Sequence, residues 1–169
     1  MAYRALFIGT VLAVWAAIAP AQSSWDRYEP GTLRNIIALH DSAVRALGVP
    51  NHPHWFISAK DFATRAHVIY SGESRPIDPL RTQIIRYWLR SAGLDTTKVQ
   101  TFQREFLVHE GDLQLWLLVQ KQVAEFFPKE LRPGQVITLY VMWLGAYYDG
   151  GDITWGFVVN EFDADTTAR

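Results

Sequence analysis

Two runs of β-branched and aromatic residues near the C-terminus constrain the fold of this chain more than any other feature of its sequence. They span residues 134–162 and read GQVITLYVMWLGAYYDGGDITWGFVVNEF. A strand with one face in water alternates apolar and polar residues, and the first run hardly alternates. We therefore expect both faces of this strand to be covered, with Gly150 and Gly151 in a hairpin turn.

The length of the first run argues against a membrane as the cover. From Val136 to Tyr148 it has 13 residues, whereas a transmembrane helix needs about 20 apolar residues. Period-two alternation divides the run into two sets. One set is Val136, Thr138, Tyr140 and Met142, and the other is Ile137, Leu139, Val141 and Trp143. We expect one set to line the inside of a barrel and the other to lie beneath a helix.

The remaining patterns predict a series of short elements. Thr32 can cap a helix that ends near Leu47, and Asp78 followed by Pro79 begins another helix, which ends at Gly93. The other expected elements are a strand at 62–71, two strands within 101–120 joined at HEGD, a short helix within 121–134, and two strands within 134–162. We expect Trp88 and Phe126, on the second and third helices, to be buried against the strands.

This order of elements resembles that of a known barrel fold. If the helix after residue 78 is an insertion, three strands, a helix and two strands remain. This order is similar to that of the five-stranded OB-type barrel. The stretch LRPGQVITLYV looks like the entry to the fourth strand of such a barrel. We therefore predict a mainly β, α+β chain: a small five-stranded OB-like barrel with an inserted helix after strand 1, a helix between strands 3 and 4, and an N-terminal helix. The alternative is an open α+β sheet with both helices on one face. The resemblance implies a fold and no activity.

The first residues, MAYRALFIGTVLAVWAAIAPAQ, are typical of a secretory signal peptide. They combine Arg4, an apolar stretch, and small residues at Ala19 and Ala21, so we predict residues 1–21 as the signal, cleaved after Ala21. An uncleaved anchor is the alternative. The mature chain would then comprise a leader, helix and loop at 22–61, the barrel at 62–162 and a tail at 163–169. We expect a periplasmic or secreted protein that does not span the membrane after cleavage.

Charge and cysteine content narrow the possible partners and chemistry. The chain has 16 Lys and Arg against 17 Asp and Glu, and no Cys. This balance argues against nucleic acid as a partner, because phosphate binding requires uncompensated basic residues. Without Cys there is no disulfide and no thiol catalysis, so the fold must rest on packing alone.

Aromatic residues on the last strands are the strongest candidates for ligand binding. Stacking on an OB-type strand face suits an extended saccharide or peptide. The candidates are Tyr147, Tyr148, Trp143 and Trp155, with Arg75 as a source of positive charge. We expect Tyr147 and Tyr148, which lie beside the 147–152 loop, to be exposed. The prediction is an exported, non-catalytic binding or accessory protein whose partner is a peptide, a saccharide or another protein.

Other patterns indicate catalysis or metal binding less specifically. The pair His52 and His54 is too few ligands for a tetrahedral metal site, and DGGD offers only two carboxylates to calcium. We therefore predict no metal, no cofactor and no catalytic residue. The alternative function is a small envelope hydrolase, in which an acid–base pair would combine one of two histidines with one of two glutamates. These residues are His109, His67, Glu105 and Glu110, with Asp112 beside them.

Overall fold

The computed structural model describes residues 27–47 and 52–164, and the predicted signal peptide lies outside them. The strands are β1 (Glu29–Pro30), β2 (His54–Pro76), β3 (Phe102–Glu110), β4 (Leu113–Gln120), β5 (Val136–Asp149) and β6 (Asp152–Ala164). The helices are α1 (Leu33–Ala46), α2 (Pro79–Ser91), α3 (Lys121–Ala124) and α4 (Phe127–Glu130), with a 3-10 helix, η1 (Thr96–Thr101), after α2. The predicted mixed α+β, β-rich fold is confirmed.

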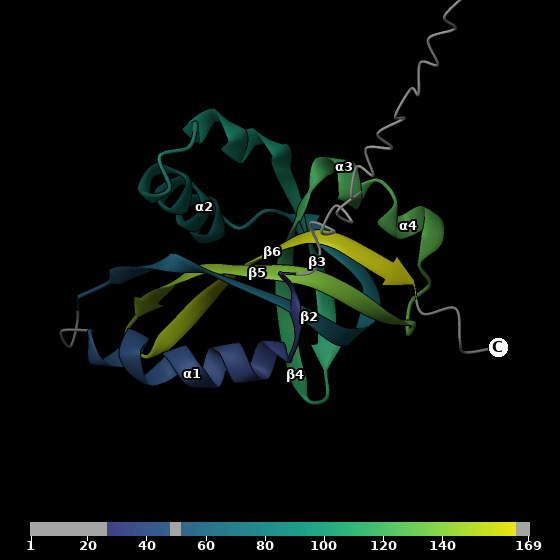
Figure 1. The fold of residues 1–169 in the computed structure, drawn as a ribbon, viewed down its shortest axis with the longest axis horizontal. Helices are drawn as coiled ribbons and strands as arrows, with labels where there is room; N and C mark the ends of the chain where they lie inside the picture. Colours follow the sequence, from purple (N-terminus) through teal and green to yellow (C-terminus); the bar gives the residue numbers. More distant parts are fainter. Residues whose placement is uncertain (1–26, 48–51, 165–169) are drawn as a thin grey trace, which may run out of the picture.

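One sheet contains all six of these strands, in the order β1-β2-β3-β4-β6-β5, and β5 also pairs with β2 (Figure 1). The long strand β2 makes this last pairing possible, because His54–Ile69 pairs with β5 while its C-terminal part pairs with β3. Strands β4 and β6 pair in parallel at Leu118 and Val158. Strand β5 therefore has two neighbours, β6 on one side and β2 on the other, and the sheet is strongly curled.

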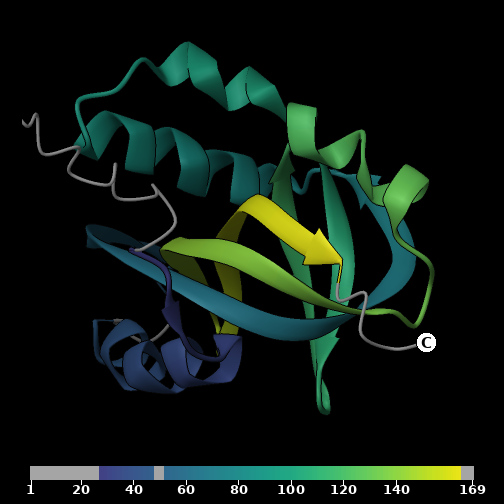
Figure 2. The ribbon, with the colours of Figure 1, turned by 45° about the vertical axis from the view of Figure 1, so that its right-hand side comes forward.

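Helices α1 and α2 lie on opposite sides of the curled sheet (Figures 1 and 2). Helix α1 contributes Leu33 and Val44 to the main hydrophobic core between the strands. Helix α2 packs Ile84, Ile85 and Leu89 on the outer face of the sheet, where they form a second core. The two apolar layers explain how one sheet is covered from both sides.

Strand β5 lies between these two cores, which explains its weak alternation. One predicted set is entirely buried in the main core: Ile137, Leu139, Val141 and Trp143. On the other face, Met142 and Leu144 lie beneath α2 in the second core, whereas Val136, at the start of the strand, is 47% exposed. The helix therefore covers only the later part of the outer face.

Several predicted boundaries are confirmed by local hydrogen bonds. The hydroxyl of Thr32 accepts from the backbone N–H of Asn35 at 3.0 Å and begins α1. The carboxylate of Asp78 accepts from the N–H of Leu80 at 2.8 Å and begins α2. Strands β3 and β4 join at the predicted HEGD turn. Side-chain caps of this kind depend only on neighbouring residues, so sequence alone can predict them.

Three predictions need correction. Strand β2 begins at His54 rather than residue 62, so the last part of the expected leader, helix and loop at 22–61 is strand. The expected irregular leader contains β1, which pairs with β2. The third helix is two short helices, and Phe126 between them is 48% exposed while Phe127 is fully buried. The break between α3 and α4 turns Phe126 outward, so its predicted burial is wrong.

Candidate functional site

A groove lies between the α2–η1 segment and the outer face of β4, β6 and β5. Its cavity volume is about 480 Å³. One wall is formed by Ile85, Trp88 and Leu89 of α2 and by Leu94 and Phe102 beyond it, and the floor by Met142, Leu144 and Val158. The interior is therefore apolar. Trp88, which we predicted to be buried, is half-buried and faces this groove.

A glycine on the floor strand sets how closely α2 approaches the sheet. A Cβ atom added at Gly156 would lie 2.6 Å from Cγ2 of Ile84, closer than carbon atoms can pack. Ile84 is fully buried and β-branched, so its side chain has little freedom to move away. The absence of a side chain at Gly156 therefore allows α2 to pack directly on β6.

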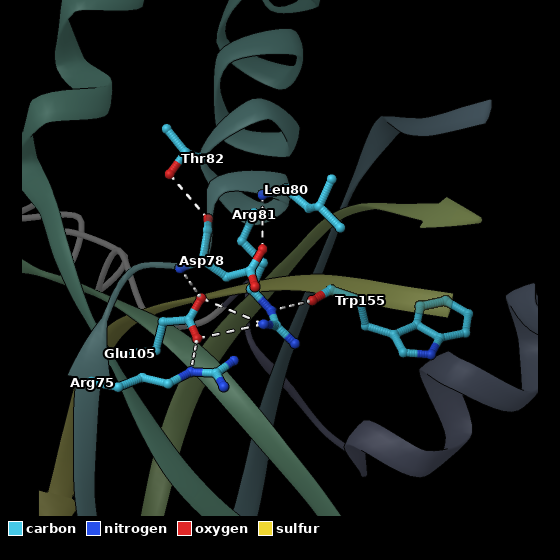
Figure 3. Close-up of polar contacts among 7 residues, drawn as sticks. All are labelled: Arg75, Asp78, Leu80, Arg81, Thr82, Glu105 and Trp155. Carbon is cyan, nitrogen blue, oxygen red and sulfur yellow. Dashed lines mark hydrogen bonds and ion pairs between the residues drawn. The ribbon is translucent and has the colours of Figure 1, made fainter. Parts of the chain in front are cut away.

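A buried carboxylate fixes the first turn of α2 to the sheet (Figure 3). Glu105 of β3 is fully buried and accepts from the backbone N–H of Asp78 at 3.0 Å. It also accepts from Nε of Arg75 at 2.8 Å and lies 3.4 Å from Nη1 of Arg81. Nε of Arg81 donates to the carbonyl of Trp155 at 3.0 Å. These contacts tie the helix to β2, β3 and β6.

Burial and the neighbouring negative charges have opposite effects on the pKa of Arg81. Burial lowers the pKa of its guanidinium, and the negative charges of Glu105 and Asp78 oppose this effect. A buried ion of this kind is stable only while its partner is present. The Glu105–Arg81 pair is therefore a structural anchor for the helix that walls the groove.

The mouth of the groove is polar. Gln122 donates to Gln120 at 3.1 Å, Gln120 donates to Asn160 at 2.8 Å, and Asn160 donates to the hydroxyl of Tyr28 at 2.6 Å. Lys98 and Thr101 of η1 also line this end, and they contribute together with Gln122 to a second, more polar hollow of about 540 Å³. An apolar interior with hydrogen-bonding groups at one end suits a ligand that is apolar along most of its length.

Comparison with known proteins identifies no relative of this chain. No protein-family model, curated protein or solved structure matches it. Function is therefore inferred from the arrangement of its own residues.

The predicted binding residues do not form one site. Tyr147 lies on the outer face, with its ring 4.4 Å from that of Trp55, which in turn lies 5.2 Å from Tyr87 of α2. Tyr148 lies on the opposite face, 5.0 Å from His54. Both tyrosines are half-buried rather than exposed. Adjacent residues of a strand point to opposite faces, so the two cannot contact one ligand from the same side.

The predicted tryptophans are part of the main core. Trp143 is fully buried and Trp155 is 8% exposed. The ring of Trp143 stacks on His40 of α1, with centroids 3.9 Å apart. Neither indole offers a free face to a ligand. Arg75, in contrast, keeps 40% of its side chain exposed.

The carboxylates considered for the hydrolase alternative, those of Glu105, Glu110 and Asp112, make structural contacts with the helices. Glu105 anchors α2 through Arg81. Glu110 accepts from the backbone N–H groups of Leu33 and Arg34 at 2.9 and 2.8 Å, and Asp112 forms an ion pair with Arg34. His67 hydrogen bonds with Thr138 at 3.1 Å. This geometry does not favour acid–base catalysis at these residues.

The residues considered as metal ligands make local structural contacts. Nε2 of His54 lies 2.8 Å from the carbonyl of Val44. Asp149 and Asp152 face each other across the two-residue turn of Gly150 and Gly151, both of which have positive φ. Within residues 27–47 and 52–164, no three His, Asp or Glu side chains are grouped as metal ligands. Over the same residues, no helix is both long and apolar enough to cross a membrane.

Sequence analysis missed the residues at the mouth of the groove. Leu94 and Lys98 come from η1 and the segment that leads into it, Gln120 from the end of β4 and Asn160 from β6, and no local pattern brings these three segments together. The one available signal was LDTTK, in which Asp95 caps η1 by accepting from the N–H of Thr97 at 2.9 Å. That cap could have predicted a short helix, although not its position over the sheet.

Proposed function

We propose that this chain is an exported, non-catalytic binding protein whose ligand is an elongated, mainly apolar small molecule with one polar end. The groove beneath α2 and η1 carries the proposal. Its apolar part, lined by residues such as Leu89, Leu144 and Val158, would hold the body of the ligand. The amide side chains of Gln120 and Asn160 and the ammonium group of Lys98 would face its polar end.

Volume and lining favour a small molecule over a macromolecule as the occupant. Pockets for small ligands range from roughly 300 to 1,000 Å³ and combine apolar walls with a few polar groups. The groove has about 480 Å³ and this kind of lining. A partner helix would be about 10 Å across and would need a longer, open face.

We further propose that the strands form an OB-like barrel. The order of pairing supports this: the third and fifth barrel strands would be β4 and β6, which pair in parallel at Leu118 and Val158. Helices α3 and α4 lie between the third and fourth of these strands, as in the OB order. Nuclear Overhauser contacts between the backbones of β4 and β6 test the closure, and their absence would leave an open sheet.

Export is a separate proposal, based on residues 1–21. N-terminal sequencing of the protein recovered from the periplasm or the medium should begin at Gln22 if the signal is cleaved after Ala21. An intact N-terminus, or a protein that stays in the cytoplasm, would contradict it. This result does not affect the proposal for the groove.

The groove is tested by binding of an apolar fluorescent probe, N-phenyl-1-naphthylamine, and its displacement by decanol. We expect the purified protein to bind the probe and Leu94→Lys to weaken binding at least tenfold. Leu94 is part of the apolar wall and is 41% exposed, so a lysine there places a charge against an apolar ligand with little effect on the core. The matched control is Leu39→Lys, because Leu39 is 64% exposed on α1, on the other side of the sheet.

Two results would overturn the assignment of the groove. One is the absence of probe binding, and the other is equal binding by both leucine variants. The aromatic group of Trp55, Tyr87 and Tyr147 favours a second candidate, a saccharide stacked beside the 147–152 loop. Thermal shift with neutral oligosaccharides that is lost in Tyr147→Ala and kept in Tyr148→Ala would support that candidate instead.

A further inference from the structure

Arg75 has an environment that the proposed groove does not explain. It stands opposite Glu105 in the β2–β3 pairing, and its Nε donates to that carboxylate at 2.8 Å. The guanidinium carbon lies 4.2 Å from the centre of the Trp116 ring on β4. Glu105 thus binds one edge of the guanidinium, and the ring of Trp116 packs against its face.

The terminal nitrogens of Arg75 are turned away from Glu105 (Figure 3). Within the part of the chain that the structure describes, Nε is the only nitrogen of this side chain with a hydrogen-bond acceptor. The side chain keeps 40% of its surface exposed, while that of Glu105 is fully buried. The four N–H groups of the terminal nitrogens therefore make no hydrogen bond within the described residues.

The charge of Glu105 is shared with a second cation. Its carboxylate also lies 3.4 Å from Nη1 of Arg81, whose side chain is only 11% exposed. Arg81 and Arg75 thus share the buried carboxylate, so Glu105 does not depend on Arg75 alone for a positive partner. The carboxylate of Asp78 is occupied by the N–H of Leu80 at the start of α2.

We propose that Arg75 is a binding site for a carboxylate group, held by two parallel hydrogen bonds from its terminal nitrogens. A guanidinium presents a planar fork that matches the two oxygens of a carboxylate. Glu105 and Trp116 already hold the fork in place, so binding costs less conformational entropy than at a mobile arginine.

The test is a titration of the full chain with sodium acetate, followed through the Arg75 side-chain resonances in ¹⁵N NMR at constant ionic strength. We expect saturable shifts at millimolar acetate, with inorganic phosphate titrated separately as the competing anion. Arg75→Lys keeps the charge and removes the fork, so acetate binding should weaken at least fivefold, measured on backbone resonances around Trp116. Arg90→Lys on the exposed face of α2 is the matched control and should bind like the unmodified protein.

A second variant separates binding from folding. Trp116→Leu removes the aromatic support and leaves the Glu105 pair intact, so acetate should bind more weakly while the fold is retained. The proposal fails if acetate produces no saturable shift, if phosphate binds more tightly, or if Arg75→Lys binds acetate as well as the Arg90→Lys control. Neutral apolar probes are absent from this titration, so its outcome is independent of the groove.

Discussion

The carboxylate of Glu110 lies 2.9 Å from the backbone nitrogen of Leu33, so the tip of the β3–β4 hairpin caps a helix 77 residues earlier in the chain. Its second oxygen accepts from the N–H of Arg34. The first N–H groups of a helix have no partner within it, and a negative charge there is favoured by the helix dipole. The carboxylate of Glu110 therefore joins the start of α1 to the turn between β3 and β4.

Replacing Glu110 should loosen α1. We expect Glu110→Ala to lower the free energy of unfolding by about 1–2 kcal/mol, since two N–H groups lose a charged acceptor. Glu110→Gln should cost less because one oxygen remains. Urea denaturation measures both, with the exposed Glu73→Ala as control. Equal stability of Glu110→Ala and the control would show that water replaces this cap without loss.

Close packing of α2 on β6 gives a second prediction. Gly156→Ala places a methyl group 2.6 Å from Cγ2 of Ile84 and should destabilise the fold by about 1–3 kcal/mol. The same change should disturb the groove, whose wall is α2. Combining it with Ile84→Ala creates room for the methyl group, so the double variant should lose less than the sum of the two single losses. Strict additivity in urea denaturation would contradict the contact.

The elements of this fold could be predicted from local sequence signals, and their arrangement around the groove could not. Thr32, Asp78 and the glycines of the β5–β6 turn act within a few residues of their own positions, so the helix starts and hairpins were confirmed. The groove instead depends on where α2 and η1 rest on the sheet. That placement follows from Gly156 and from the contacts of Glu105 with Arg81, which join residues far apart in the sequence.

The positions of the predicted binding residues on the sheet could not be predicted from the sequence, for a related reason. Trp143 and Trp155 suggested a stacking surface, but the same aromatic residues fill the core of a chain that has no disulfide. A pattern of alternation places residues on faces without showing which face a helix covers. Arg75 was predicted from its charge, while its partner Trp116 could be identified only from the structure.

The adjacent pair Phe126 and Phe127 should differ sharply in their effect on stability. Phe127 is fully buried against Tyr70, Phe106 and Phe162, so Phe127→Ala should cost about 3–5 kcal/mol. Phe126 is 48% exposed and contacts only Lys129 among the described aromatic and cationic neighbours, so Phe126→Ala should cost less than about 1 kcal/mol. Thermal and urea denaturation of the two variants check this order. Similar losses would contradict the prediction and show that the side chain of Phe126 is also buried.

Stability should fall in mildly acidic solution because of His40. Its ring stacks on Trp143, and burial lowers the pKa of the imidazole below its ordinary value of 6.5. Nε2 of His40 is buried without a hydrogen-bond partner among the described residues, so a proton there would find no acceptor. The unfolded chain then binds a proton at pH values where the folded chain does not. The contribution of neutral His40 is complete above pH 6.5 and decreases as the pH falls through 6.5 towards the lowered value.

The variant that isolates this effect is His40→Phe, which keeps an aromatic ring against Trp143 and removes the titrating group. We expect its free energy of unfolding to change less between pH 7 and pH 5 than that of the unmodified protein, measured by urea denaturation at each pH. The exposed His52→Ala is the control and should keep the original pH dependence. If His40→Phe loses stability as steeply as the unmodified protein, another group is responsible, and α1 is held to the core independently of the protonation of His40.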